Sequence, residues 1–468
     1  MKNILPDTIC AISTAPGAGA VAMIRLSGDE AFEIGEKLIQ FPGQHQTIKN
    51  QAVNSVHFAR FMLNNQLLDE VIVAKFIAPH SYTGEDTLEI TCHGSVFIQQ
   101  KILEILIRQG ARLARPGEFT LRAFLNGKLD LSQAEGVADL IASNSEAAHR
   151  LAINQMRGGI SDELKGLRNQ LLHFISLVEL ELDFSEEDVE FADREKLYQL
   201  TDAIERLLRR LVKSFSYGNA IKNGIPVAIV GRTNAGKSTL LNRLLKEEKA
   251  IVSAIAGTTR DYIEDTIVLE GINFRFIDTA GLRKTHDEIE IIGIERALKK
   301  YREAEIVIVV IDAGDQPEEI AHSLAMLRHE GYEKKHLIFA LNKIDKVLNP
   351  EALLKDLRQR IGAEGDYLTL SAKEGFQVGL LEKKLVEAAV KNKPSETDVI
   401  ITNVRHFEAL QRSHESILRV LEGLDNIIPT DLLAMDIRQV LHYLGEITGE
   451  ITTDEILGNI FKNFCIGK

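Results

Sequence analysis

The segment Gly231–Ser238 (GRTNAGKS) most constrains this chain of 468 residues, because it fits the phosphate-binding pattern G-x-x-x-x-G-K-[ST]. Residues 226–230 (PVAIV) before it read as a buried strand, and residues 239–245 (TLLNRLL) after it begin a helical pattern. Glycines let such a loop direct its N–H groups and a helix N-terminus at phosphate oxygens. Lys237 would reach the β- and γ-phosphates, and the Ser238 hydroxyl would ligate Mg²⁺.

Composition narrows the classes of protein to which the chain can belong. A hydrophobic content of 45%, a charged content of 26% and a mean hydropathy of -0.05 are typical of a soluble protein with real cores. No apolar run is long enough for a membrane span or a signal peptide, so we expect a cytoplasmic protein. Cys10, Cys92 and Cys465 are scattered, which argues against a disulfide framework and a structural zinc site. The net charge of -13 argues against polyanion binding over the whole surface, but it does not exclude a local basic site.

The order of patterns along the chain predicts an α/β and α protein in which one domain is inserted into another. Residues 1–125 mix short β-like runs with glycine turns, which predicts a small α/β domain. Helical spacing of apolar residues dominates 126–217 and returns in 389–468, so these stretches are predicted to pack as one helical domain. Between them, residues 218–388 alternate strands and helices, which predicts a mainly parallel sheet.

Three further motifs follow predicted strands and point to a guanine nucleotide. In Asp278-Thr279-Ala280-Gly281, the aspartate would hold Mg²⁺ through water and the last N–H would contact the γ-phosphate. In Asn342-Lys343-Ile344-Asp345, the aspartate would accept hydrogen bonds from two N–H groups that guanine has and adenine lacks. Ser371-Ala372-Lys373 resembles the second guanine loop. The order and spacing of these motifs resemble the GTPase superfamily.

The hydrolytic residues depart from those of Ras. Leu282 follows the Asp278–Gly281 motif where Ras-like proteins have a glutamine, and leucine cannot hydrogen-bond the attacking water. Three nearby carboxylates could replace that glutamine, and sequence chemistry does not choose among them: Asp287, Glu288 and Glu290.

The segment between the phosphate loop and Asp278, and the loop itself, also offer candidate metal ligands. Thr259, or alternatively Thr258, would complete the Mg²⁺ shell. No arginine finger is evident in the chain, but a monovalent cation held by the Asn234 carbonyl would place positive charge near the β–γ bridge.

Motifs in every part of the chain resemble those of the MnmE (TrmE) family of tRNA-modification GTPases. They are GRTNAGKST, AIAGTTRD, DTAGLRKTHDEIEIIGIERA, NKID, the N-terminal SYTGEDTLEI and ARPGEFTLRAFLNGKLDLSQAE, and the terminal FCIGK. Thr233 stands where the family often has proline, and Ser253 stands where a threonine is common. Neither difference removes a ligand.

The resemblance implies a GTP hydrolase that works with an FAD-dependent partner, MnmG (GidA). Together they add an aminomethyl or carboxymethylaminomethyl group to carbon 5 of the tRNA wobble uridine, with a tetrahydrofolate derivative as the one-carbon source. The family protein is a homodimer joined through its N-terminal domains, and it forms a heterotetramer with MnmG. Its Ras-like GTPase domains pair in the GTP state, where K⁺ acts. No membrane contact is expected, and the FAD belongs to the partner.

The resemblance also implies roles for individual residues. Lys237 and Glu290 are the expected catalytic residues, and Glu290 would position the attacking water. The expected Mg²⁺ ligands are Ser238 and Thr259, and the expected K⁺ contacts are Asn234, Ser253, Ile255 and Thr258. The expected folate-binding residues are Arg25, Glu89, Lys128 and Lys468, with Cys465 in contact with the folate or uridine site. The expected GTP-binding residues are Asn234, Ala235, Gly236, Lys237, Ser238, Thr239, Ser253, Ala254, Ile255, Ala256, Gly257, Thr258, Thr259, Asp278, Thr279, Ala280, Gly281, Asn342, Lys343, Ile344, Asp345, Ser371, Ala372 and Lys373.

Two other functions stay open from the sequence. A ribosome-assembly GTPase of the tandem-domain kind would need two phosphate loops, and this chain has one. A non-hydrolysing scaffold gated by nucleotide would keep the binding motifs without turnover.

Overall fold

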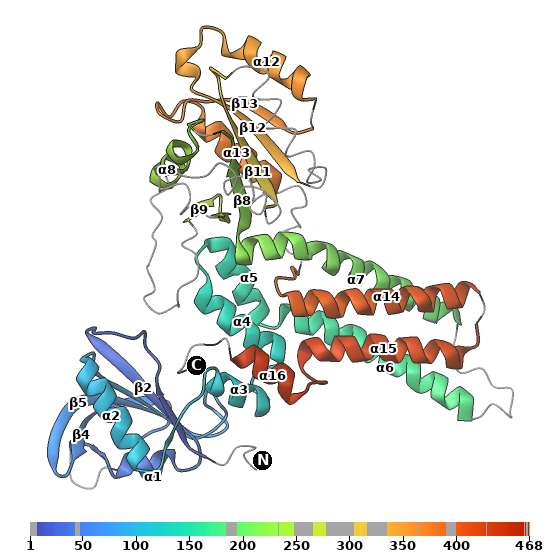
Figure 1. Cartoon of the computed structure of the whole chain (residues 1–468). Helices are drawn as coiled ribbons and strands as arrows, with labels where there is room; N and C mark the ends of the chain where they lie inside the picture. Colours follow the sequence, from blue (N-terminus) through green and yellow to red (C-terminus); the bar gives the residue numbers. More distant parts are fainter. Residues whose placement is uncertain are drawn as a thin grey trace. The chain divides into compact units, whose positions relative to one another are not determined.

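Figure 1 shows the computed structural model of the chain. It describes residues 7–42, 47–183, 194–232, 234–247, 265–277, 304–315, 335–362, 364–389, 399–426, 428–462, 464 and 467. The chain divides into a first compact unit (Met1–Ile141, Ile153–Gln199 and Glu415–Lys468) and a second (Ala142–Ala152 and Leu200–His414). The domain boundaries predicted from the sequence stay a prediction.

The first unit contains a seven-stranded sheet with the order β3-β4-β5-β6-β2-β1-β7. Its strands are β1 (Ile9–Ile12), β2 (Val21–Ser27), β3 (Ile39–Gln40), β4 (Ser55–Leu63), β5 (Gln66–Phe76), β6 (Thr87–His93) and β7 (Arg112–Leu113). Neighbouring strands are antiparallel except for β1 and β7. Helices α1 (Ala31–Glu36) and α2 (Val96–Arg108) supply buried Ile34, Ile102 and Leu106 to the core formed with this sheet. The small α/β fold expected near the N-terminus is confirmed.

Helices make up the rest of the first unit. They are α3 (Glu118–Leu125), α4 (Leu131–Ala142), α6 (Gly159–Asp183), α15 (Thr430–Thr448) and α16 (Asp454–Phe461), with parts of α5 (Glu146–Met156), α7 (Arg194–Asn223) and α14 (Val404–Asp425). The long helix predicted from apolar spacing is α6, where Leu164 and Leu171 are buried. Arg168 on α6 forms an ion pair of 2.6 Å with Glu450, just after α15. The helical character predicted for residues 126–217 and 389–468 is therefore confirmed.

The second unit is built on a six-stranded sheet with the order β13-β12-β11-β8-β10-β9. Its strands are β8 (Ile225–Val230), β9 (Asp265–Leu269), β10 (Ile272–Phe276), β11 (Ile306–Asp312), β12 (His336–Asn342) and β13 (Asp366–Thr369). All strand pairs are parallel except β9 with β10 at the edge. This confirms the mainly parallel sheet that the sequence predicts. The unit's other described elements include α8 (Lys237–Glu247), α12 (Pro350–Ile361), α13 (Val378–Ala389) and the 3₁₀ helix η3 (Ile344–Lys346), together with the remaining parts of α5, α7 and α14.

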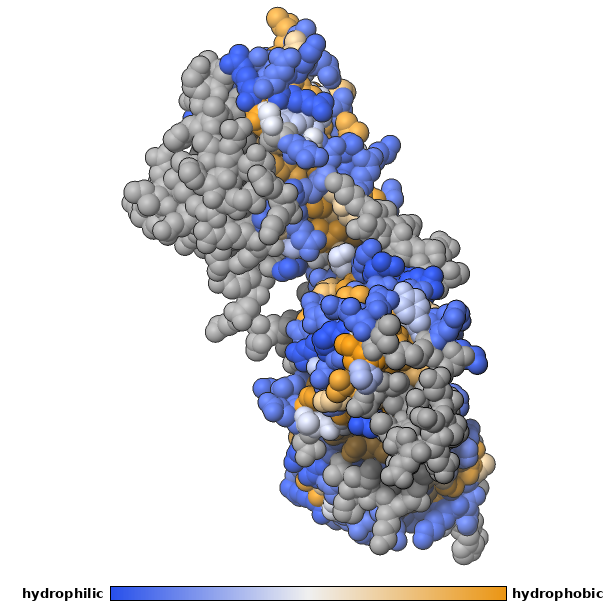
Figure 2. Space-filling view, turned by 90° about the vertical axis from the view of Figure 1, so that its right-hand side faces the viewer, coloured by the Kyte–Doolittle hydropathy of each residue, from blue (hydrophilic) through white to orange (hydrophobic). Residues whose placement is uncertain are grey.

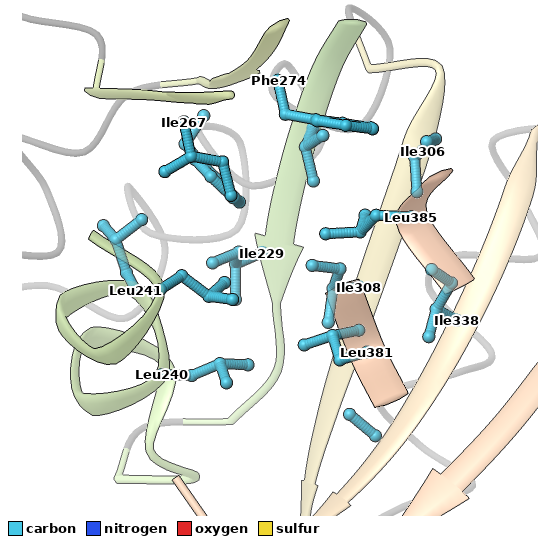
Figure 3. Close-up of a cluster of buried hydrophobic side chains, with 14 of the residues drawn as sticks. Ile229, Leu240, Leu241, Ile267, Phe274, Ile306, Ile308, Ile338, Leu381 and Leu385 are labelled. Carbon is cyan, nitrogen blue, oxygen red and sulfur yellow. The ribbon is translucent and has the colours of Figure 1, made fainter. Parts of the chain in front are cut away.

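Two hydrophobic cores hold this sheet between helices. Figure 3 shows one of them, in which Leu240 and Leu241 of α8 and Leu381 and Leu385 of α13 surround strand residues such as Ile308. The other core lies against α12, whose Leu357 and Ile361 pack with strand residues of the opposite face. The strands are buried on both faces, which explains why they read as continuous apolar runs. In the described residues no helix is long and apolar enough to cross a membrane, and the coloured surface in Figure 2 is mainly hydrophilic.

Candidate active site

The phosphate loop follows β8, a strand with parallel neighbours on both sides. At Gly231 (φ +147°) a Cβ atom would lie 2.2 Å from the carbonyl oxygen of Val310, so only glycine lets the chain leave the sheet there. At Gly236 (φ +101°) a Cβ atom would lie 2.2 Å from Asn342 Nδ2. The two glycines of the motif therefore permit close contacts with neighbouring strands, and α8 begins directly after the second.

Lys237 lies in the first turn of α8 and turns back over the loop. Its Nζ donates to the carbonyl oxygens of Gly231 at 2.8 Å and Arg232 at 2.6 Å. This holds the ammonium group within the loop, where phosphate oxygens would bind. Ser238 and Thr239 follow on the same turn, and Asn234 is exposed with a left-handed φ of +65°.

Asn342 connects the phosphate loop to the loop Ser371–Lys373. It is the last residue of β12 and is 2% exposed. Its Nδ2 donates to the carbonyl oxygen of Ala235 at 2.8 Å, and its Oδ1 accepts from the Ala372 N–H at 3.0 Å. The structure thus brings three of the predicted GTP-binding motifs together through one amide side chain.

Asp345 lies on η3 at the exposed edge of the site. Its Oδ1 accepts a hydrogen bond of 2.7 Å from the Ser371 hydroxyl, and this bond holds the pKa of the Asp345 carboxyl below its ordinary value. The carboxylate is therefore ionised at neutral pH and oriented by the loop Ser371–Lys373. Lys373 is exposed on that loop.

Asp312 contacts the candidate site and was not predicted from the sequence. It ends β11 and accepts from Lys343 Nζ at 2.5 Å and from the Gly314 N–H at 3.0 Å. Burial raises the pKa of the Asp312 carboxyl, but the Lys343 bond and charge outweigh this and lower it overall. Nearby, Asp315 forms an ion pair of 3.1 Å with Arg232 of the phosphate loop. The acidic residue that ends the apolar run IVIVVID could have indicated this position.

Several predicted residues lie outside the described part of the chain. They are Thr233, Ser253, Ala254, Ile255, Ala256, Gly257, Thr258, Thr259, Asp278, Thr279, Ala280, Gly281, Glu290, Cys465 and Lys468. Their roles stay predictions from the sequence.

A second group of predicted residues meets on the first unit's sheet. Both Arg25 Nε and Nη2 donate to Glu89 Oε1, at 3.0 and 2.8 Å, and among the described residues no hydrogen bond goes to the other carboxylate oxygen. The Arg25 guanidinium lies 5.2 Å from the ring centroid of Tyr82. Lys128 Nζ donates to the Pro79 carbonyl oxygen at 2.9 Å, in the loop 78–86 that also carries Tyr82. Tyr82 was not identified from the sequence.

Buried charges hold this loop in place. Arg122, 1% exposed, donates to Glu85 at 3.1 Å, to Asp7 at 2.7 Å and to Glu118 at 3.3 Å. Burial raises the pKa of the Glu85 carboxyl, and the Arg122 charge offsets only part of that rise. Removing Arg122 would leave the Glu85 carboxylate buried without its counter-charge, so this pair holds the loop against α3.

Gly467, near the end of the chain, contacts the same sheet. The Ser13 hydroxyl donates to the Gly467 carbonyl oxygen at 3.0 Å. Gly467 has a φ of +96°, and a Cβ atom there would lie 2.3 Å from the Ile12 carbonyl oxygen. Ile12 ends β1, the strand that pairs with β2 and so with Arg25.

Two family models match the chain. The model described as "GTP-binding protein TrmE N-terminus" matches residues 8–128, and "MnmE helical domain" matches residues 131–465. Among solved structures, Era in complex with MgGDPNP and part of 16S ribosomal RNA is 26% identical, covering 41% of this chain and 65% of that chain with a TM-score of 0.28. That TM-score is too low to bear on fold or function.

Curated relatives match over nearly the full length. The chain is 53% identical to the tRNA modification GTPase MnmE of Bacteroides thetaiotaomicron, over 99% of both chains. It is 52% identical to the protein of that name from Parabacteroides distasonis, over 99% of this chain and 100% of the relative. The chain therefore belongs to the MnmE family of tRNA modification GTPases.

Proposed function

We propose that this protein hydrolyses GTP to drive modification of the wobble uridine of tRNA, together with the FAD-dependent protein MnmG (GidA). The main support is the hydrogen-bonded assembly of the phosphate loop, Asn342, Asp345 and Ser371 in a member of the MnmE family. Family membership also favours this function over the ribosome-assembly and scaffold hypotheses. The product would carry an aminomethyl or carboxymethylaminomethyl group at carbon 5.

The residues of the loop fit magnesium and a triphosphate. Ser238 offers a hydroxyl oxygen, a hard ligand of the kind Mg²⁺ prefers, and Thr259 would offer a second. When bound, Mg²⁺ would neutralise charge on the β- and γ-phosphates. Lys237 and the N-terminal amides of α8 would bind the same oxygens, and Glu290 would orient the attacking water.

A potassium ion is proposed to replace the arginine finger. Asn234 is exposed on the phosphate loop, which suits a ligand that completes its site only when two GTPase domains pair. Ser253, Ile255 and Thr258 would be the other K⁺ contacts. A fixed positive charge near the β–γ bridge stabilises charge that develops during phosphoryl transfer.

Replacing potassium with sodium tests this proposal. Steady-state GTP turnover should be at least about tenfold faster in KCl than in NaCl at equal ionic strength, because the smaller ion fits the same oxygens poorly. If GTP turnover is substantial and equally fast in KCl and NaCl, K⁺ has no role in hydrolysis. Equal rates near zero would instead favour the non-hydrolysing scaffold.

The Arg25–Glu89 pair is proposed to bind a tetrahydrofolate derivative. The pterin ring carries adjacent N–H donors, and a carboxylate that keeps one oxygen available can accept from them. Lys128 and Lys468 would contact other parts of the ligand, and the anchoring of Gly467 beside β1 supports a place for the C-terminus near this pair. The bound folate would supply the one-carbon unit.

Glu89→Gln should weaken binding of a reduced folate by about 10- to 100-fold, because the amide faces the pterin donors with a donor of its own. Isothermal titration of the full-length protein measures this. Glu70→Gln is the matched control: Glu70 is an exposed carboxylate on the same sheet, 3.8 Å from Arg60, and its loss should not change the affinity. Equal folate affinity in the Glu89 variant and wild type would refute the site.

A second copy of the chain is proposed to cover the open face of the first unit's sheet. Val56, Phe58 and Ile72 on β4 and β5 are 67%, 49% and 46% exposed. Phe58 pairs with Ile72, and Val56 pairs with Ala74, whose neighbour on β6 is Glu89. The exposed apolar residues thus share a face with the candidate folate site, which supports a homodimer formed there. The heterotetramer with MnmG is proposed from family membership alone.

A further inference from the structure

Arg243 connects the helix that follows the phosphate loop to the loop that orients Asp345. It lies on α8, two turns beyond Lys237, and its side chain is half-buried. Its Nη2 donates to the carbonyl oxygen of Lys373 at 3.3 Å. Among the described residues, no other side chain from outside the loop 371–376 forms a hydrogen bond or ion pair with residues 373–375. Arg243 is therefore the polar contact that α8 makes with the outer end of this loop.

Gly375 gives the Arg243 guanidinium room to lie against the loop. Gly375 has a left-handed φ of +77°, and a Cβ atom there would lie 2.5 Å from Arg243 Nη2 and 3.0 Å from Cζ. A larger residue would therefore push the guanidinium away and would also strain the backbone. The close approach of the two residues depends on glycine at this position.

The loop 371–376 is a tight turn that carries the Ser371 hydroxyl. The Ser371 N–H donates to the Phe376 carbonyl oxygen at 3.1 Å, and the Gly375 N–H donates to the Ser371 carbonyl oxygen at 2.8 Å. The Glu374 N–H donates to the Ser371 hydroxyl oxygen at 3.3 Å. That hydroxyl donates in turn to Asp345 Oδ1 at 2.7 Å. Three bonds thus tie Ser371 to the outer end of the turn, and a displacement there would move the hydroxyl that orients Asp345.

Apolar packing fixes the inner end of the loop. Ala372 is 2% exposed and belongs to the same hydrophobic core as Leu240 and Leu244 of α8. By contrast, Lys373 and Glu374 at the outer end are exposed. A guanidinium is a rigid group with several donors, so it can fix a carbonyl oxygen that apolar contacts leave unfixed.

We propose that Arg243 is a positioning residue for guanine recognition, which holds the loop 371–376 so that the Ser371 hydroxyl orients the Asp345 carboxylate toward the base. Arg243 does not touch the nucleotide but acts through the loop. Because α8 also carries Lys237, one helix sets the position of the base-binding loop relative to the phosphates. The inference rests on the proposed function, since GTP is the nucleotide whose base Asp345 would bind.

The test compares GTP with inosine triphosphate, whose base lacks the exocyclic amine of guanine. In the full-length protein, Arg243→Met removes the guanidinium but keeps an unbranched apolar stem and a high helix propensity. Arg360→Met is the matched control, because Arg360 is exposed on α12 of the same unit and pairs there with Asp356. Competition against a fluorescent guanine nucleotide in Mg²⁺ and KCl gives both affinities.

Arg243→Met should weaken GTP binding by about 3- to 10-fold, the effect expected for one lost hydrogen bond, and should weaken binding of inosine triphosphate less. The ratio of the two affinities should fall, because only GTP has both N–H donors that a well-oriented Asp345 accepts. A merely structural defect would weaken both nucleotides equally. Arg360→Met should bind both nucleotides as wild type does.

A double-mutant cycle with Ser371→Ala tests the route by which Arg243 acts. If Arg243 positions the Ser371 hydroxyl, the double variant should bind GTP about as tightly as Ser371→Ala alone. Fully additive losses, or an unchanged ratio of affinities in Arg243→Met, would overturn the inference and leave the proposed function intact. A wild-type protein that binds inosine triphosphate as tightly as GTP would count against guanine recognition by Asp345, and so against both.

Discussion

Asp345→Asn should weaken GTP binding by about 10²- to 10⁴-fold and should raise the affinity for xanthosine triphosphate. The ionised carboxylate is oriented by the Ser371 hydroxyl at 2.7 Å, so it can accept from both N–H groups of guanine. An asparagine in its place turns one acceptor into a donor. Xanthine has a carbonyl oxygen where guanine has its amine, and that oxygen can accept from the new amide. Competition against a fluorescent guanine nucleotide measures both affinities.

Asp356→Asn is the matched control for this experiment. Asp356 is an aspartate of α12 in the same unit, paired with Arg360 at 2.7 Å and outside every predicted nucleotide motif. Its loss should leave both affinities unchanged. If Asp345→Asn also keeps wild-type GTP affinity, the base is recognised elsewhere and the assignment of the Asn342–Asp345 motif is wrong.

Glu290→Ala should slow single-turnover GTP hydrolysis by about 10²- to 10⁴-fold while GTP affinity stays near that of wild type. A carboxylate that orients water acts in the transition state and contributes little to ground-state binding. Quench-flow measurement of GDP formation in KCl gives the rate, and equilibrium titration gives the affinity. A parallel fall in affinity would indicate a binding role instead.

Glu288→Ala provides the comparison for that variant, because it removes a carboxylate two residues away. It should hydrolyse GTP at close to the wild-type rate. If Glu288→Ala is slow and Glu290→Ala is not, the water-orienting role moves to Glu288. If neither is slow, Asp287 becomes the candidate.

The sequence predicted the features that depend on local pattern. Apolar runs located the strands that carry the phosphate loop and the Asn342–Asp345 motif, because a strand buried on both faces needs a continuous apolar run. The spacing of Leu164 and Leu171 located α6 because burying one side of a helix requires that period.

Contacts between distant segments could not be predicted in the same way. The Asp312–Lys343 pair forms because β11 and β12 are neighbours in register, which no local pattern specifies. The buried Arg122 cluster joins acids from three separate segments, and each of them reads as an ordinary surface charge in the sequence. Tyr82 lies beside Arg25 because contacts with distant segments, the Arg122 cluster among them, hold the loop 78–86.

The most direct test of guanine recognition by Asp345 is the choice between GTP and ATP by the wild-type protein. Purified protein in Mg²⁺ and KCl is loaded with a fluorescent guanine nucleotide, and unlabelled GTP and ATP are compared as competitors. We expect GTP to displace the probe at a concentration at least about 10³-fold below that required of ATP, because adenine leaves the Asp345 carboxylate without its two donors. Equal displacement by ATP and GTP would contradict guanine recognition by Asp345.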